Sequence, residues 1–303
     1  MYRQIARNKR WSILLIALFC VAVVGLGVFS AWVVGEVWPF WLLLIFCPLY
    51  VWWALSSATT SAASTAGWAA TDAEQQPRLH KVVETTAIRA GIPMPKVGVI
   101  DDPAPNAFAA SLSPKNAVIG VTTGALALLD DSELEAVVAH EVAHIVNYDG
   151  RVTLTTFALV GSIASVAGML MVLGWGLVRS ILSEFKLGLG LIMGMLGILM
   201  IVIGTAFAAV AFVLGPLISS AVSRRREFLA DASGVELTRF PEGLVRALEK
   251  IHAHPSTVKA ASFEVRGLFF VNTIGEGVLA QWLGSHPPVA ERVERLKEIG
   301  RGF

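Results

Sequence analysis

The sequence predicts a mainly α-helical integral membrane protein, with four membrane-spanning helices and a polar α+β domain that contains a small β-sheet. Three observations support this fold class. Of the 303 residues, 55% are hydrophobic and only 16% are charged. The mean hydropathy of +0.65 lies outside the usual range of soluble domains. Long apolar runs occur in two pairs, and the segments between and after them have the patterns of amphipathic helices and short strands.

The first pair of apolar runs covers residues 11–34 and 38–55. Each run lacks charge and is close to the ~20 residues that a membrane-spanning helix needs. A signal peptide would also begin with basic residues, but this apolar run is too long for one and a second run follows at once. We therefore expect residues 1–57 to form a transmembrane hairpin. Tryptophans lie near the ends of both runs, as expected at headgroup depth: Trp11, Trp32, Trp38, Trp41, Trp52 and Trp53.

The second pair of apolar runs covers residues 152–178 and 187–222. Because the later run is too long for one span and contains Gly215-Pro216, we expect its helix to end or kink near residue 215. The predicted second hairpin therefore covers residues 152–215, with its later span at about 187–215. A shallow re-entrant hairpin would also fit this pattern.

The distribution of basic residues predicts the orientation in the membrane. Residues before the first span are basic, the loop at 35–37 has no basic residue, and three arginines follow the last span. By the positive-inside rule, the N-terminus and residues 58–151 and 216–303 are cytoplasmic. Arg179 and Lys186 oppose this assignment, because their loop would lie outside. The net charge of +1 and the lack of a basic stripe argue against nucleic-acid binding.

The polar segment between the hairpins is expected to contain a helix and a small sheet. A helix is predicted for residues 77–90, because the segment begins with a proline and is followed by Gly91. Strands are predicted at residues 96–100 and 117–122, with a turn-rich stretch between them. Residues 56–73 are rich in Ser, Ala and Thr and are interpreted as a loose exit from the membrane.

A further helix is predicted to begin with a capping box formed by Ser132 and Glu135. Glu141 and His144 fall on the apolar face of this helix. Because burial of ionisable groups is costly unless they are paired or bind a metal, this placement predicts a functional site. The apolar face is defined by residues at helical spacing: Leu134, Val137, Val138 and Ile145.

The motif His140-Glu141-Val142-Ala143-His144 lies on this helix. Two histidines four residues apart project from one helix face, so their imidazoles can bind a single Zn²⁺. Glu141 would lie beside the metal and act as a general base toward water. The alternative interpretation is a chance match of this short motif.

A catalytic zinc usually has a third protein ligand. The metzincin extension is excluded, because the chain has Asn147 and Gly150 where that pattern needs Gly and His. Glu227 is the better candidate, and Asp231, four residues later, could accept a hydrogen bond from a ligand histidine. If both late runs span the membrane, Glu227 returns to the side of His144. Alternatively, both carboxylates are solvated and pair with the neighbouring arginines.

Several ordered motifs extend the pattern beyond the histidine pair. They are residues 105–109 (PNAFA), 121–124 (VTTG), the HEVAH helix, residues 223–232 (SRRREFLADA), and His286-Pro287-Pro288 followed by Arg292. With these motifs, the chain resembles the HtpX family of bacterial membrane zinc metalloproteases, relatives of the CAAX prenyl proteases. The resemblance covers nearly the whole chain.

The resemblance implies that residues 58–151 and 216–303 are two parts of a cytoplasmic α+β metalloprotease domain of the gluzincin type. It implies Glu227 as the third zinc ligand, with Asp231 and Asp149 as supporting residues. His286 is implied as a catalytic residue that stabilises the oxyanion. Substrate binding is implied for an edge strand that pairs with the substrate backbone, and for one arginine: Asn106, Ala107, Phe108, Ala109 and Arg292.

These features predict a zinc-dependent membrane endopeptidase with one Zn²⁺ per chain. The resemblance implies a location in the bacterial inner membrane and damaged or misfolded membrane proteins as substrates. A processing protease with a narrow substrate and a catalytically silent membrane scaffold are the alternatives. An intramembrane protease is disfavoured, because acidic residues at 130–135 lead into the metal helix. Residues 256–283 match no motif and are interpreted as a variable lid or a substrate-gating element.

Overall fold

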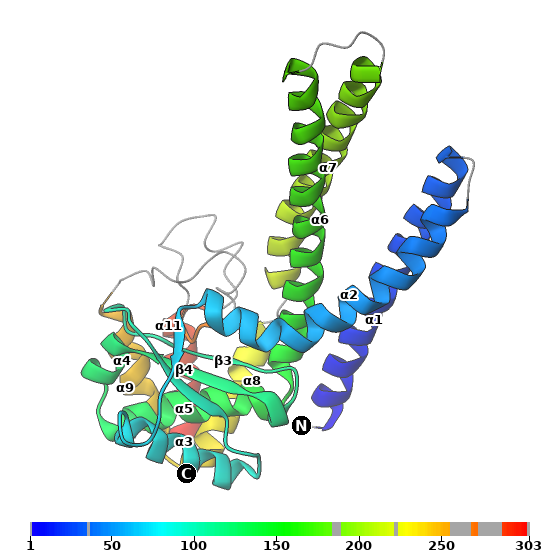
Figure 1. Ribbon diagram of the computed structural model, residues 1–303. Coiled ribbons are helices and arrows are strands. Elements are labelled where there is room, and N and C mark those ends of the chain that lie inside the picture. The colour runs from blue at the N-terminus through cyan, green and yellow to red at the C-terminus, as the bar shows by residue number, and fades with distance from the viewer. Residues whose placement is uncertain are drawn as a thin grey trace.

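The computed structural model describes residues 2–34, 37–183, 189–220, 224–254, 268–271 and 287–301. Two helical hairpins extend from a body of shorter helices and strands (Figure 1). The N-terminal hairpin consists of α1 (Tyr2–Val34) and α2 (Trp38–Thr65), and the second consists of α6 (Asp149–Ser183) and α7 (Leu189–Ser220). Because α6 leaves the body and α7 returns to it, the chain on either side of this hairpin belongs to the same body (Figure 1).

The second hairpin contains two segments long and apolar enough to cross a membrane, Asp149–Arg179 and Gly190–Ala209. Their most apolar windows have mean hydropathies of 2.1 and 2.4, and only 28% and 17% of these windows are buried. Apolar helices that are this exposed are unlike the core helices of a soluble domain. In α1 and α2, large apolar side chains such as Leu18 and Trp52 are also exposed.

Two glycines bring α6 and α7 into close contact. A Cβ atom at Gly174 would lie 2.5 Å from the carbonyl oxygen of Gly197, and one at Gly197 would lie 2.6 Å from the carbonyl oxygen of Gly174. Such distances are too short for any side chain. Small residues of this kind permit the close backbone approach by which membrane helices associate.

One sequence prediction about helix ends was wrong, and another was wrong in part. Residues 56–65 belong to α2 and do not form a loose membrane exit. Their alanines, including Ala58 and Ala62, are buried against the body, and alanine has the highest helix propensity. In the second hairpin, α7 does not end near residue 215 but continues past Gly215-Pro216 to Ser220, because proline is tolerated more readily in membrane helices than in soluble ones. A kink at this point stays a prediction.

The body contains a four-stranded sheet with the strand order β1-β2-β4-β3. β1 (Trp68–Ala70) pairs antiparallel with β2 (Lys96–Ile100), β2 pairs parallel with β4 (Val118–Thr122), and β3 (Ala107–Ala110) pairs antiparallel with β4. The prediction of β2 was confirmed, and β4 begins one residue later than predicted. β3 lies within the stretch predicted to be rich in turns, and it forms one edge of the sheet.

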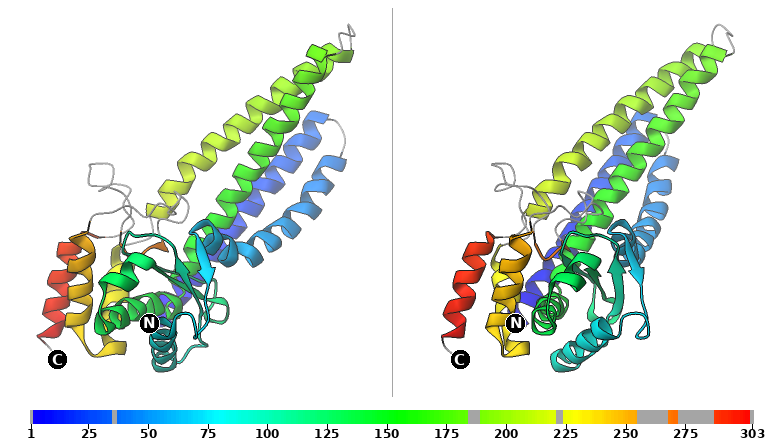
Figure 2. Two further views of the ribbon diagram at one scale, coloured as in Figure 1. Left: turned by 60° about the vertical axis from the view of Figure 1, so that its left-hand side comes forward. Right: turned by 90° about the vertical axis from the view of Figure 1, so that its left-hand side faces the viewer.

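The helices of the body lie in layers beside the sheet. They are α3 (Pro77–Ala90), α4 (Thr123–Leu128), α5 (Asp131–Val146), α8 (Arg224–Thr238), α9 (Pro241–His252) and α11 (Val289–Gly300). Figure 2 shows the sheet, then α5, then α8 and α9, then α11 in succession. The predicted helix at residues 77–90 is α3, which ends at Gly91 in a left-handed conformation. α5 therefore lies at the centre of the body.

α5 begins with a capping box, but the residues differ from the prediction. Asp130 Oδ1 accepts a hydrogen bond from the Glu133 backbone at 2.9 Å, and Glu133 Oε2 accepts one from the Asp130 backbone at 2.9 Å. Ser132 and Glu135 were predicted for these roles, but the helix begins at Asp131 and includes both. Glu135 instead pairs with Arg89. The error arose because both sequence pairs have the same spacing.

Candidate metal centre

α5 and α8 bring three predicted metal ligands together, although α6 and α7 separate them in the chain. His140 and His144 lie one turn apart on α5, and Glu227 lies in the first turn of α8. The two helices pack closely, since a Cβ atom at Gly234 of α8 would lie 3.1 Å from the backbone nitrogen of His140. This contact aligns Glu227 with the histidine pair.

The ligand atoms of these three residues converge within 4.8 Å of one another. His140 Nε2 and His144 Nε2 are 3.1 Å apart. Glu227 Oε2 is 3.7 Å from His140 Nε2, and Glu227 Oε1 is 3.6 Å from His144 Nε2. The ligand atoms come from two imidazoles and one carboxylate, which is a ligand set found in catalytic zinc sites.

The outer nitrogen of each imidazole faces a carboxylate. His140 Nδ1 lies 2.9 Å from Asp231 Oδ1, and His144 Nδ1 lies 3.0 Å from Asp149 Oδ2. Each Nδ1–H donates to its carboxylate, so the Nε2 atoms that face each other at 3.1 Å both carry lone pairs. Two lone pairs at this distance repel each other unless a proton or a metal cation lies between them. The residues therefore fit a metal ion.

The pKa values of both histidines shift upward in the metal-free protein. Burial lowers the pKa of His140, but hydrogen bonds to Asp231 and Glu227 raise it by more. Burial also lowers the pKa of His144, and the charge of Glu227 and the hydrogen bond to Asp149 outweigh it. Two nearby carboxylates thus favour positive charge at each imidazole. A bound metal ion would satisfy the same preference and displace the proton.

Glu141 lies next to the first histidine and is fully buried. Its Oε1 accepts no hydrogen bond within the described part of the chain. Burial raises the pKa of Glu141 to about 8, and the charge of Glu227 adds to the rise, while His144 and Arg292 oppose it. Glu141 also lines a recess of about 30 Å³ together with His144 and Glu227, which is room for about one water molecule.

Arg292 lies beneath the ligands, although the resemblance places it with the substrate-binding residues. Its side chain is 1% exposed. Its Nε and Nη2 atoms donate to Asp231 at 2.9 and 2.7 Å, and its Nη1 donates to the carbonyl oxygen of Phe270 at 3.0 Å. Burial raises the pKa of Asp231, but the charge of Arg292 and the hydrogen bond from His140 outweigh it, so that this pKa falls to about 2.

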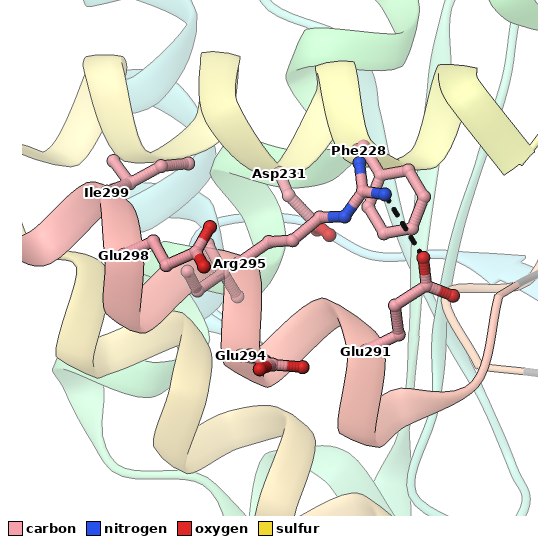
Figure 3. Close-up of a pocket in the computed structure, with 8 residues that line it drawn as sticks. Phe228, Asp231, Glu291, Glu294, Arg295, Glu298 and Ile299 are labelled. Atoms are coloured by element: carbon pink, nitrogen blue, oxygen red, sulfur yellow. Dashed lines mark hydrogen bonds and ion pairs between the residues drawn. The ribbon is translucent and has the colours of Figure 1, made fainter.

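α11 brings Arg292 to this position and is itself attached to α8. The guanidinium of Arg295 lies 3.7 Å from the ring centroid of Phe228 and pairs with Glu291 at 3.1 Å. Figure 3 shows this contact beside a surface pocket between α8 and α11, with Asp231 behind it. Asp231 lines this pocket, but His140, His144 and Glu227 do not.

Residues 269–271 of the same chain pair with the outer edge of β3. Phe269 forms an antiparallel bridge with Phe108, and Phe270 N donates to Ala107 O at 2.8 Å. Asn106 donates to Val271 O at 3.1 Å and accepts from Val271 N at 3.2 Å. Of the five residues implied to bind substrate, Ala109 alone lines the recess beside Glu141.

Some residues at the site were missed or lie beyond it. His286 and most of residues 256–283 lie outside the described residues. Two residues at the site were not predicted from the sequence. They are Phe270, whose ring centroid is 4.9 Å from that of His140, and Asn8, which donates to Asp149 Oδ1 at 2.7 Å. Neither lies in a motif, and neither has a sequence neighbour that marks it as part of a site.

Comparisons with known proteins agree with this geometry. Residues 73–300 match the family described as "Peptidase family M48". A "Protease HtpX homolog" from Streptococcus thermophilus is 38% identical over 305 residues, covering 99% of this chain and 100% of the relative. A homologue with the same description from Dictyoglomus turgidum is 38% identical, covering 99% of this chain and 95% of the relative. Another from Tropheryma whipplei is 36% identical and covers both chains completely.

Among solved structures, the crystal structure of Ste24p from S. mikatae aligns with a TM-score of 0.47 and 21% identity. The alignment covers 98% of this chain and 66% of that chain. The family match spans most of the chain, and the curated relatives match over their full or nearly full length. The chain therefore belongs to peptidase family M48 and is a membrane-bound metalloprotease of the HtpX type.

Proposed function

We propose that the protein is a zinc-dependent endopeptidase in which His140, His144 and Glu227 bind one Zn²⁺. The observation that carries this proposal is the 3.1 Å separation of the two Nε2 atoms, with both Nδ1 atoms committed to carboxylates. Such a pair of lone pairs, completed by the carboxylate of Glu227, suits a cation with nitrogen and oxygen ligands. A zinc ion at this set would supply a Lewis acid that activates water near neutral pH and polarises the scissile carbonyl.

Glu141 acts as the general base in this proposal. Its carboxylate lines the recess beside His144 and Glu227, so its Oε1 can take the proton of the attacking water and deliver it to the leaving amine. Burial raises the pKa of Glu141 in the metal-free protein, and a cation bound beside it would lower this pKa and favour the carboxylate that accepts the proton. Asp231 and Asp149 keep both imidazoles in the Nδ1–H tautomer, and Arg292 compensates the buried charge of Asp231.

The peptide substrate pairs with the edge of β3 that lines the recess, near Ala109. Main-chain hydrogen bonds of this kind tolerate many side chains, which suits a protease with broad specificity. At Asn106–Phe108 the edge is occupied by residues 269–271, so substrate pairing there requires this segment to move. We assign oxyanion stabilisation to His286 by its resemblance to the family histidine.

We also propose that both hairpins cross the membrane and that the body lies on the cytoplasmic side of a bacterial inner membrane. The exposed apolar side chains of α1 and α2 support two spans beyond α6 and α7, and the basic N-terminus supports the orientation. A body at the membrane surface would meet damaged or misfolded membrane proteins, which we propose as substrates.

The test compares wild type with Glu141→Gln, each purified in detergent, on an unfolded protein substrate with zinc measured on the same samples. Glu135→Gln is the matched control, because it makes the same change on the outer face of the same helix. We expect one zinc per chain in all three proteins and loss of cleavage in Glu141→Gln alone.

Three results would change the proposal. Equal cleavage by all three proteins would assign the activity to a contaminant, and zinc-free wild type without cleavage would favour a catalytically silent scaffold. Cleavage of one substrate and not of a panel of unfolded membrane proteins would favour a processing protease with a narrow substrate.

A further inference from the structure

The N-terminal end of α1 lies beside the body (Figure 1). There Asn8 contacts Asp149, the carboxylate partner of His144, although the two residues are 141 positions apart in the sequence. Asn8 is 3% exposed. Its Nδ2 atom donates one hydrogen bond to Asp149 Oδ1 at 2.7 Å and another to the carbonyl oxygen of Asn147 at 3.1 Å. Both N–H groups of the carboxamide therefore donate hydrogen bonds to the junction between α5 and α6.

This junction determines where the carboxylate partner of His144 lies. α5 ends at Val146 and α6 begins at Asp149, and Tyr148 between them has a φ of 57°. The left-handed conformation is unfavourable for a residue other than glycine and persists where surrounding contacts impose it. Asn8 contacts the residue before Tyr148 and the residue after it, so it fixes both sides of this turn.

The two oxygens of Asp149 have different partners. Oδ1 accepts from Asn8 at 2.7 Å, and Oδ2 accepts from His144 Nδ1 at 3.0 Å. The backbone carbonyl of Asp149 also accepts from the buried Arg226 at 3.2 Å. Because a carboxylate bonded on one oxygen has a fixed rotation, the contact with Asn8 directs Oδ2 toward the imidazole. A carboxamide donates this bond without adding charge.

We propose that Asn8 is a positioning residue of the metal centre, which orients Asp149 toward His144 and thereby couples the placement of the N-terminal membrane helix to metal affinity. The inference rests on the proposed binding of zinc by His140, His144 and Glu227. Partners that orient a ligand histidine typically contribute about 10–100-fold to metal affinity. Through this contact, a helix distant from the motif in sequence contributes to the site.

The test measures zinc affinity by competition with a chromophoric chelator, using the full-length protein in detergent. We expect Asn8→Ala to weaken zinc binding on the order of 10-fold. Asn8→Asp keeps the size of the side chain but places a carboxylate against Asp149, so we expect a loss at least as large. Ser12→Ala is the matched control, because Ser12 is buried one turn further along α1 and donates only to the backbone oxygen of Asn8.

A second measurement separates positioning from general loosening of the helix. In an Asp149→Asn background, we expect Asn8→Ala to cause no further loss of zinc affinity, because the residue through which it acts is already altered. Equal losses in both backgrounds, or equal losses for Asn8→Ala and Ser12→Ala, would overturn the proposal. Unchanged zinc affinity of Asn8→Ala would also overturn it, whereas wild type that binds no zinc would overturn the proposed function itself.

Discussion

Arg292 and Asp231 form a buried ion pair in which the guanidinium donates two hydrogen bonds, at 2.9 and 2.7 Å, to the two oxygens of the carboxylate. Asp231 Oδ1 also lies 2.9 Å from His140 Nδ1. The positive charge of α11 therefore reaches His140 through a carboxylate of α8, and Arg292 Nη1 also lies 3.9 Å from Oε2 of Glu227. Neither charge of the pair is accessible to solvent, so each depends on the other.

Arg292→Met should strongly destabilise the protein, because it leaves the charge of Asp231 buried without its partner. Removing one member of a buried pair costs about 3–5 kcal/mol. Thermal unfolding in detergent measures this loss. Arg295→Met is the matched control on the same helix, since Arg295 is about half exposed, and we expect it to cost about 1 kcal/mol or less. Similar melting temperatures for the two variants would contradict the role of the pair.

The parts of the structure that the sequence predicted well depend on local patterns. The bounds of α3 follow from Pro77 and Gly91, and β2 follows from a short apolar run between polar residues. The convergence of His140 and His144 follows from helical periodicity alone. Each of these features is determined by residues that lie only a few positions apart in the chain.

The parts that sequence reasoning missed depend on contacts between distant segments. Asn8 lies in a basic stretch whose composition indicates only membrane orientation, and its partner is 141 residues away. Arg292 was grouped with substrate-binding residues, because no local signal indicates that it lies beneath the ligands. The extension of α2 to Thr65 was missed for a similar reason, since its alanines alternate with Ser and Thr and are buried against residues that lie far along the chain.

Glu141 makes the stability of the metal-free protein depend on pH. Burial raises its pKa from 4.5 to about 8. A carboxyl whose pKa is raised by folding contributes stability below the unfolded pKa, and this contribution is lost as the pH rises through the folded pKa. Glu141→Gln removes the titration. We therefore expect metal-free Glu141→Gln to melt at a higher temperature than wild type at about pH 9, and at a similar temperature at about pH 5.

The measurement is a series of thermal unfolding curves in chelator across this pH interval. Glu135→Gln, which loses a surface ion pair with Arg89, controls for the loss of one negative charge from the same helix. If the difference from wild type varied with pH in the same way for both variants, burial of Glu141 would not explain the effect.

The close contact between α6 and α7 predicts different effects for two neighbouring glycines. Gly174→Ala should destabilise the hairpin, because the new Cβ would lie 2.5 Å from the carbonyl oxygen of Gly197 and the helices would have to separate. Gly176→Ala is the matched control, since a Cβ there meets nothing within 4 Å. We expect a lower melting temperature for Gly174→Ala, and an unchanged or higher one for Gly176→Ala, because alanine favours helix.

This pair of variants also tests whether the hairpin aligns the site. Because α7 leads directly into α8, separation of the two helices should displace Glu227 from the histidines and weaken zinc binding. Zinc affinity that falls in Gly174→Ala and not in Gly176→Ala would support this coupling. A hairpin that tolerates both substitutions equally would contradict the packing.

Glu227→Ala should abolish tight zinc binding, because two histidines remain and Oε1 and Oε2 no longer complete the set. The substitution also removes a buried negative charge that raises the pKa values of both histidines, so the metal-free variant should fold. Glu236→Ala, on the exposed face of α8, is the matched control. Zinc should raise the melting temperature of wild type and Glu236→Ala in a concentration-dependent manner, and it should leave that of Glu227→Ala unchanged. A wild-type zinc response in Glu227→Ala would remove this residue from the ligand set, because the bound state would then not depend on its carboxylate.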